Sequence, residues 1–287
     1  MVEESTLFLV LIAFAIGYMF FGTLDCVLSL AVLCRKGTKL LMMREYLIVL
    51  SIFDLGVLYS GLLPNIMEAY GIIGDYSSDK QCKLTQFFIF FFLEGSSWMS
   101  VIITIERMVF VLFPYLDRSK RCQATSLVVL VTLLIIINAP MSLLWKLEGS
   151  ICDGPSILKN SYFIKYSIIP SAILILSNIV ITYKLCTQSA PARGSPNLQP
   201  VLLVFAISGF FLMTTFPASI ILNRTEHPDP IIFLFVRLLL YTNNTFNFIL
   251  YILVSKIFRE ELLLMLKWKR PNETRLTQLR VVSNTPM

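Results

Sequence analysis

Charged side chains interrupt the apolar runs of this sequence at only a few positions. Asp54 stands in the middle of one run, and Glu106 and Arg107 close another. A charge surrounded by apolar groups is costly unless it is paired, hydrogen-bonded or in contact with water or an ion. We therefore expect Asp54 to hold a proton, a cation or hydrogen-bond donors. We expect Arg107, whose guanidinium stays protonated, to be paired or to face water.

A polar stripe near the C-terminus adds a second group of candidate residues. Asn243, Asn247 and Tyr251 follow one another at intervals of four, so they share one face of a helix. Such a stripe can hold helices together through hydrogen bonds. With Asp54 and Ser96, the two asparagines also offer the oxygen atoms that a hydrated Na⁺ requires. The alternative is a protonated Asp54 that simply hydrogen-bonds to Asn247.

The composition places these residues in a membrane. Of 287 residues, 56% are hydrophobic and only 15% are charged, against roughly 25% charged in a soluble domain. This excludes a soluble enzyme, a disordered chain and a nucleic-acid-binding domain. The 24 Lys and Arg residues, against 18 Asp and Glu, lie between apolar stretches and fit membrane topology better than nucleic acid. One histidine cannot build a His-rich zinc site, and no nucleophile stands with a base, so we expect no enzyme.

Seven segments are long enough to cross a bilayer, which takes about 20 apolar residues. They are Leu7–Leu33, Tyr46–Tyr70, Leu84–Phe113, Thr125–Trp145, Tyr162–Cys186, Pro200–Leu222 and Ile231–Val254. The sequence thus predicts an all-α membrane protein, a seven-transmembrane helix bundle over residues 7–254. A short N-terminus (1–6) precedes it, and residues 255–287 form a short helix and a tail.

The loops predict the orientation of the bundle. With the N-terminus outside, the inner loops and tail hold sixteen Lys and Arg residues and the outer side six, and positive charge favours the cytoplasm. We therefore expect a plasma-membrane protein with its tail in the cytoplasm. Only Cys82 and Cys152 then lie on the oxidising side, which favours a disulfide between them.

The order and spacing of these residues resemble the rhodopsin-like (class A) G-protein-coupled receptors, across all seven spans. The matching features are Leu50 and Asp54, the outer cysteines Cys82 and Cys152, Glu106-Arg107 in place of Asp-Arg-Tyr, Phe211 six residues before Pro217, Asn247-Phe-Ile-Leu-Tyr251 in place of Asn-Pro-x-x-Tyr, and Phe258-Arg259 at the start of an amphipathic eighth helix. Departures from the family pattern stand at Met108, Thr215 and Phe248.

The resemblance implies a receptor that binds an extracellular ligand and activates a heterotrimeric G protein. Arg107 would pair with Glu106 at rest and meet the G protein when active. The residues implied in activation are Glu106, Arg107, Phe211, Pro217, Asn247 and Tyr251. An allosteric Na⁺, held by Asp54, Ser96, Asn243 and Asn247, would favour the resting state; the resemblance implies no other cofactor.

The residues expected near the outer side limit the chemical classes of the ligand. Tyr241 stands where an opsin carries its retinal lysine, and Ile89 replaces the aspartate of amine receptors, so neither light nor an amine is expected. Arg237 would lie near the mouth, where it meets either a carboxylate ligand or Glu68. The seventh span also resembles invertebrate FMRFamide-type peptide receptors and nematode chemosensory receptors. The ligand is thus a neuropeptide or a small chemosensory molecule.

Two more residues carry expectations. Asn223 opens an Asn-Arg-Thr glycosylation sequon on the outer side, and Glu94 is expected to be a buried protonated or hydrogen-bonded group.

A seven-span channel or transporter is the alternative to a receptor, with Asp54 and Asn247 lining an ion path. Internal repeats would favour that alternative, and the sequence contains none.

Overall fold

The computed structural model describes residues 2–40, 43–69, 78–113, 120–148, 151–187, 199–224 and 230–266. Within these ranges the chain is almost entirely helical. The helices are α1 (Val2–Leu33), α2 (Arg44–Val57), α3 (Leu63–Ala69), α4 (Asp79–Leu112), α5 (Lys120–Ser142), α6 (Ser156–Phe163), α7 (Ile169–Thr187), α8 (Gln199–Arg224), α9 (Pro230–Thr245), α10 (Asn247–Val254) and α11 (Lys256–Met265). A 3₁₀ turn spans Lys36–Leu40, and π-helical turns at Leu58–Leu62 and Ile164–Ile168 join α2 to α3 and α6 to α7. Strands β1 (Lys146–Glu148) and β2 (Ile151–Asp153) form an antiparallel hairpin.

Six helical segments of the described chain are long and apolar enough to cross a membrane, and the α9–α10 pair makes a seventh if it counts as one span. The two helices of that pair are bent by 44° at a break after Thr245. The predicted segments overlap these helices, but several helices begin earlier than expected, namely α1 at Val2, α5 at Lys120 and α6 at Ser156. Helix α4 also begins early, at Asp79 instead of Leu84. The Ser78 side chain caps it by accepting a hydrogen bond from the Gln81 backbone N–H at 3.3 Å.

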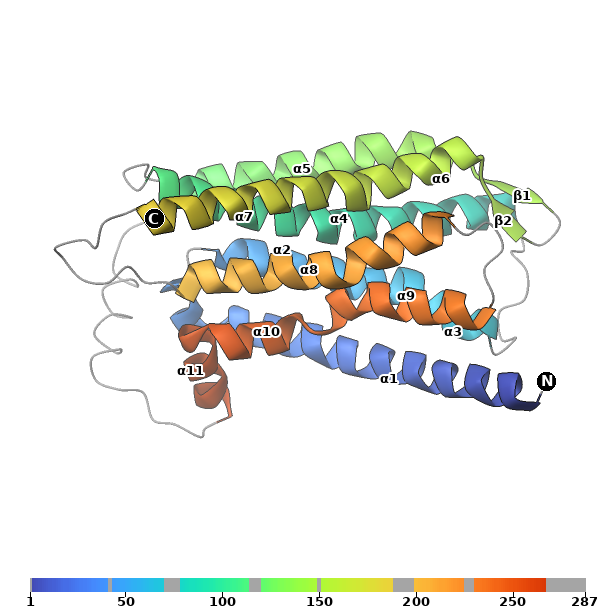
Figure 1. Cartoon of the computed structure of the whole chain (residues 1–287), viewed down its shortest axis with the longest axis horizontal. Coiled ribbons are helices and arrows are strands. Elements are labelled where there is room, and N and C mark those ends of the chain that lie inside the picture. Colours follow the sequence, from blue (N-terminus) through green and yellow to red (C-terminus); the bar gives the residue numbers. More distant parts are fainter. Residues whose placement is uncertain are drawn as a thin grey trace.

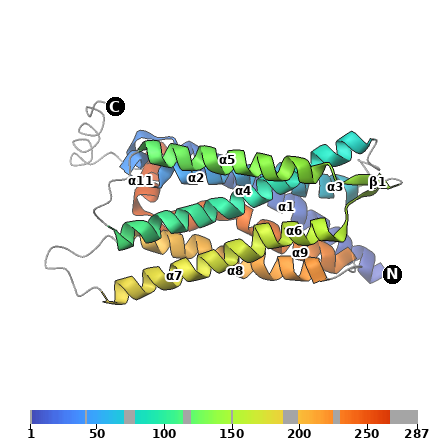
Figure 2. The same cartoon turned by 90° about the horizontal axis from the view of Figure 1, so that it is seen from above.

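The long helices lie lengthwise against one another (Figures 1 and 2). The start of α1 and the β1–β2 hairpin lie at one end of the bundle, and α11 turns across the opposite end (Figure 1). Ser255 starts α11 by accepting a hydrogen bond from the Phe258 backbone N–H at 3.3 Å. The two ends of the bundle are therefore built differently.

The bundle exposes apolar side chains on its surface and buries polar ones in its interior, which is the reverse of a soluble protein. Val128 and Ile136 on α5, and Leu143 directly after it, are each at least 60% exposed, whereas Asp54, Asn138 and Thr104 are completely buried. Exposed apolar faces of this size are stable against lipid and not against water. The described helices are those of a multi-pass membrane protein.

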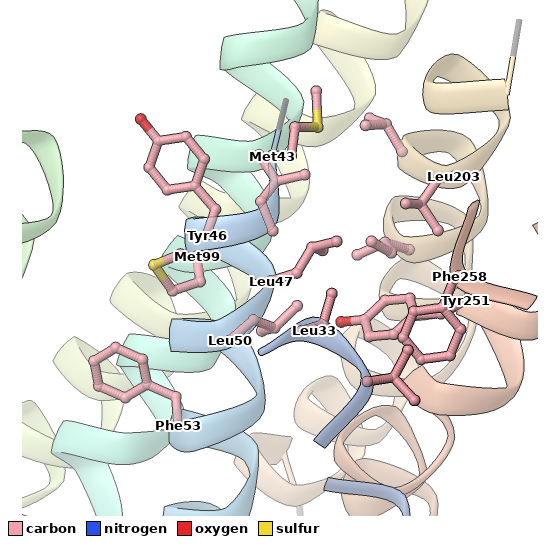
Figure 3. Packing of buried hydrophobic residues seen from close by; sticks show 14 of the residues in the cluster. Leu33, Met43, Tyr46, Leu47, Leu50, Phe53, Met99, Leu203, Tyr251 and Phe258 are labelled. Carbon is pink, nitrogen blue, oxygen red and sulfur yellow. The ribbon is translucent and has the colours of Figure 1, made fainter. Parts of the chain in front are cut away.

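The core is formed where α2 packs against its neighbours. Leu47, Leu50 and Phe53 of α2 meet Met99 of α4 and Tyr251 of α10 in one buried cluster (Figure 3). Two glycines allow this close approach, because a Cβ atom at Gly56 would collide with the Phe92 ring and one at Gly95 with the Phe53 ring. Small residues at a helix contact are a common device of membrane bundles. They bring Asp54 within reach of α4.

Candidate functional site

Four polar side chains from α2, α4, α9 and α10 meet in the middle of the bundle. Asp54 Oδ1 accepts hydrogen bonds from the Ser96 hydroxyl at 2.6 Å and from the Asn244 amide at 2.7 Å. Asp54 Oδ2 accepts one from the Asn247 amide at 2.6 Å. All four residues are buried. This network, which we call the Asp54 cluster, ties the second, third and last spans together.

Asn243 does not take the place predicted for it. No hydrogen bond joins Asn243 to Asp54 among the described residues, and its neighbour Asn244 bonds to both Asp54 and Ser96. The spacing argument assumed one continuous helix from residue 243 to 251. The helix breaks at Phe246, so the residues before the break are rotated relative to Asn247.

The break itself is held by a second carboxylate. Asp25 of α1 is buried, and both of its oxygens lie 3.0 Å from the backbone nitrogen of Phe248. Phe248 is the second residue of α10, where a helix has backbone N–H groups without partners inside the helix. A carboxylate at this end also interacts favourably with the helix dipole. Asp25 thus caps α10 from another helix.

The oxygen atoms of the Asp54 cluster fit a Na⁺ in part. The Asp54 carboxylate and the Ser96 hydroxyl are hard oxygen ligands 2.6 Å apart. The amides of Asn244 and Asn247 here donate their N–H groups to the carboxylate, so their carbonyl oxygens must turn inward to join such a site. No group of three or more His, Cys, Asp or Glu residues suited to a metal occurs within the described ranges.

Glu106 and Arg107 point to different neighbours. Glu106 Oε1 accepts a hydrogen bond from the Tyr46 hydroxyl at 3.1 Å. The buried Arg107 guanidinium lies 4.9 Å from the centre of the Phe110 ring. No ion pair joins Glu106 to Arg107 in the part of the chain that the structure describes, so that expectation is not met. Adjacent residues on a helix project in different directions and do not face each other.

The other residues implied in activation are buried beside the same helices. Phe211 of α8 packs against Val101 and Leu174, and Pro217 lies inside α8. Tyr251 is completely buried with its ring 5.5 Å from that of Phe258. These contacts join α8 and α10 to the rest of the bundle.

The expected disulfide is present. Cys82 at the start of α4 is bonded to Cys152 of β2, with their Cα atoms 5.5 Å apart. It fixes the hairpin over that end of the bundle, where Cys82 packs with Trp145 and Tyr162. Beside it, the Lys159 ammonium and the Gly154 N–H hold the pKa of the Asp153 carboxyl below its usual value.

Glu94 forms a buried ion pair. The sequence predicted a buried protonated or hydrogen-bonded Glu94, but not a cation as its partner. Its carboxylate lies 2.9 Å from the Lys165 ammonium and accepts a hydrogen bond from the Asn138 amide at 2.9 Å. Lys165 is one of the six charges expected on the outer side, but it lies in the π-helical turn between α6 and α7. Its position inside the predicted span Tyr162–Cys186 was the signal that it needs a partner in the bundle.

Only part of the predicted ligand pocket comes together. Arg237 of α9 donates a hydrogen bond to Asn65 of α3, and the Asn65 amide donates one to the Tyr241 hydroxyl at 3.2 Å. Asn65, which the sequence did not single out, joins the two predicted residues. Ile89 of α4 is half-buried, with no contact to them among the described interactions, and the side chain of Glu68 falls outside the described part of the chain.

Asn223 lies in the last turn of α8 and is half-buried. Thr225 of its sequon and residues 267–287 of the predicted tail are outside the described residues.

Neither a protein-family model nor a curated protein matches the chain. Its function must be inferred from its own residues.

Proposed function

We propose that this chain is a rhodopsin-like G-protein-coupled receptor. The Asp54 cluster carries the proposal, because one mid-bundle carboxylate holds Ser96 of α4 and both halves of the broken last span. The hydrogen bonds of this cluster can differ between two arrangements of the helices. The buried Arg107 near the end of α4 supports the proposal, since no carboxylate pairs with it in the described ranges.

In this proposal the chain crosses the plasma membrane seven times, with α9 and α10 as one broken span and α11 as the amphipathic eighth helix. The N-terminus and the Cys82–Cys152 hairpin face outward, and Asn223 carries a glycan. Removing Lys165 from the outer charges, because it pairs with Glu94 inside the bundle, changes the charge count from sixteen against six to sixteen against five, which supports the same orientation.

The mechanism is a shift between two arrangements of the bundle. An extracellular ligand, a neuropeptide or a small chemosensory molecule, must bind one arrangement better than the other. Phe211 and Pro217 let α8 move, α10 turns with Tyr251, and Arg107 becomes accessible to the G protein. The protein does no covalent chemistry and is not an enzyme.

Guanine-nucleotide exchange tests the receptor function. We expect that purified protein in nanodiscs, screened with neuropeptide and small-molecule libraries, accelerates exchange on a purified heterotrimeric G protein when a ligand is added. The alternative, a channel or transporter, predicts ion current or solute flux in proteoliposomes without any effect on exchange. That pattern would contradict the receptor function.

The sodium site is tested without a ligand. If Na⁺ binds to Asp54, replacing K⁺ by Na⁺ at constant ionic strength stabilises the protein by about 1 kcal/mol when Na⁺ is in roughly fivefold excess over its dissociation constant. Asp54→Asn should abolish that increase in the melting temperature. The exposed carboxylate of Asp79 provides the control, because Asp79→Asn should keep the response. A wild-type protein equally stable in Na⁺ and K⁺ leaves Asp54 with a structural role only.

A further inference from the structure

One face of α9 carries Phe233, Arg237 and Tyr241 at intervals of four residues. Arg237 and Tyr241 of this face contact α3 through Asn65. The residues that α9 exposes, Ile232 at 53% and Phe235 at 58%, lie on other faces. The Arg237 side chain therefore points into the bundle and not toward lipid.

The described contacts of Arg237 are polar and aromatic but uncharged. Its guanidinium donates to Asn65 and lies 4.1 Å from the centre of the Phe233 ring. Gly61 makes room for the Tyr241 hydroxyl, which a Cβ atom there would approach to 2.7 Å. These contacts hold the guanidinium in position, and none of the described ones supplies a counter-charge.

Two other cations of the described helices are neutralised by carboxylates. Lys165 pairs with Glu94 at 2.9 Å, and Arg35 pairs with Glu261 at 2.8 Å. Among the side chains that the structure describes, which do not include that of Glu68, no Asp or Glu lies within ion-pair distance of Arg237. A partly buried cation without a counter-ion is costly in a membrane, so an anion from outside the described chain would be favourable there.

A second tyrosine lies close to Tyr241. Tyr166, in the π-helical turn between α6 and α7, packs in one buried cluster with Tyr241 and with Ala218, the neighbour of Ser219 in α8. Tyr166, Tyr241 and Ser219 are buried. The two tyrosines thus lie in one cluster, and Asn65 joins Tyr241 of that cluster to Arg237.

We propose that Arg237 binds the carboxylate of an extracellular ligand whose apolar part lies against Phe233 and the two tyrosines. The proposal rests on the receptor function and specifies its ligand class. A guanidinium offers two parallel N–H groups that match the two oxygens of a carboxylate. Asn65 and Tyr241 are positioned to complete the hydrogen bonding, and an amine would be repelled.

Thermal unfolding with simple probes tests this proposal. The purified protein in phosphatidylcholine nanodiscs is titrated with hexanoate, octanoate and benzoate, and with the matched primary amides and hexylamine. We expect at least one carboxylate, but neither its amide nor the amine, to raise the melting temperature. Arg237→Gln should weaken that binding by about thirtyfold or more, and Arg237→Lys by less, because the charge is kept. Lys159→Gln, which removes an exposed cation, is the control and should not change it.

Several outcomes would overturn the proposal. They are an absence of stabilisation by all three carboxylates, equal stabilisation by the amides, and carboxylate binding that survives Arg237→Gln. Stabilisation by phosphatidylserine nanodiscs alone, lost in Arg237→Gln, would assign the site to a lipid headgroup instead. If Arg237→Gln does not fold, two measurements still test the proposal. They are the carboxylate affinity of Arg237→Lys and the comparison of carboxylates with their amides in the wild-type protein.

The experiment also separates this inference from the receptor function. Carboxylate binding that depends on Arg237 but never accelerates nucleotide exchange would support the site and contradict the receptor. Exchange that is driven by a neutral or cationic ligand and is unchanged in Arg237→Gln would support the receptor and contradict the ligand class.

Discussion

Replacing Asp25 by leucine will destabilise the bundle by about 2 kcal/mol, because it leaves the Phe248 backbone N–H buried without an acceptor. Asp25→Asn should cost less, since an amide oxygen can still accept that hydrogen bond. Thermal unfolding in nanodiscs measures both. Ser29→Ala, one turn further along α1, is the matched control, because its buried hydroxyl has no hydrogen-bond partner in the part of the chain that the structure describes. The loss of that hydroxyl should have little effect.

A double-mutant cycle isolates the contact between Asp25 and Phe248. Phe248→Pro removes the N–H that Asp25 accepts, at a position in the first turn of α10 where proline is tolerated. It also removes the contact of the Phe248 ring with Phe258, at 5.5 Å. Combined with Asp25→Leu, it should cost less than the sum of the two single changes. Strictly additive losses would show that Asp25 does not cap α10.

In the receptor proposal, Arg107→Ala will reduce nucleotide exchange to the rate of the G protein alone, while the melting temperature changes little. The guanidinium packs over Phe110 and pairs with no carboxylate among the described residues, so its removal leaves no buried anion behind. The assay compares wild type and variant at equal surface expression, using any ligand that activates the wild type. Arg121→Ala, at the exposed start of α5, is the charge-matched control. Full exchange in a well-expressed Arg107→Ala protein would refute the role of Arg107.

Much of the helical framework was predictable from the sequence. A run of about 20 apolar residues has little alternative to a helix in a membrane, because every backbone polar group must be bonded within the segment. The same argument does not predict the residues at which a helix begins and ends. The start of α4 depends on the Ser78 cap, and the hairpin of β1 and β2 is too short to leave a pattern.

The break after Thr245 was not predictable, because neither proline nor glycine stands there to mark it. The break becomes stable only when Asp25, more than 200 residues away, accepts the freed N–H of Phe248. It changes which asparagine faces Asp54, so a periodicity argument from one uninterrupted helix selected Asn243 over Asn244.

By itself, the sequence determined that the chain is a multi-helix membrane protein and which charged residues would need partners inside it. Apolar length and the cost of burying a charge are local properties, and they identify Asp54, Glu94 and Arg237 from their neighbours alone. Only the tertiary structure decided the partners: Asn244 and Ser96 for Asp54, Lys165 for Glu94, Asn65 for Arg237. Those pairings depend on the rotation of each helix about its axis, which packing against the other helices sets.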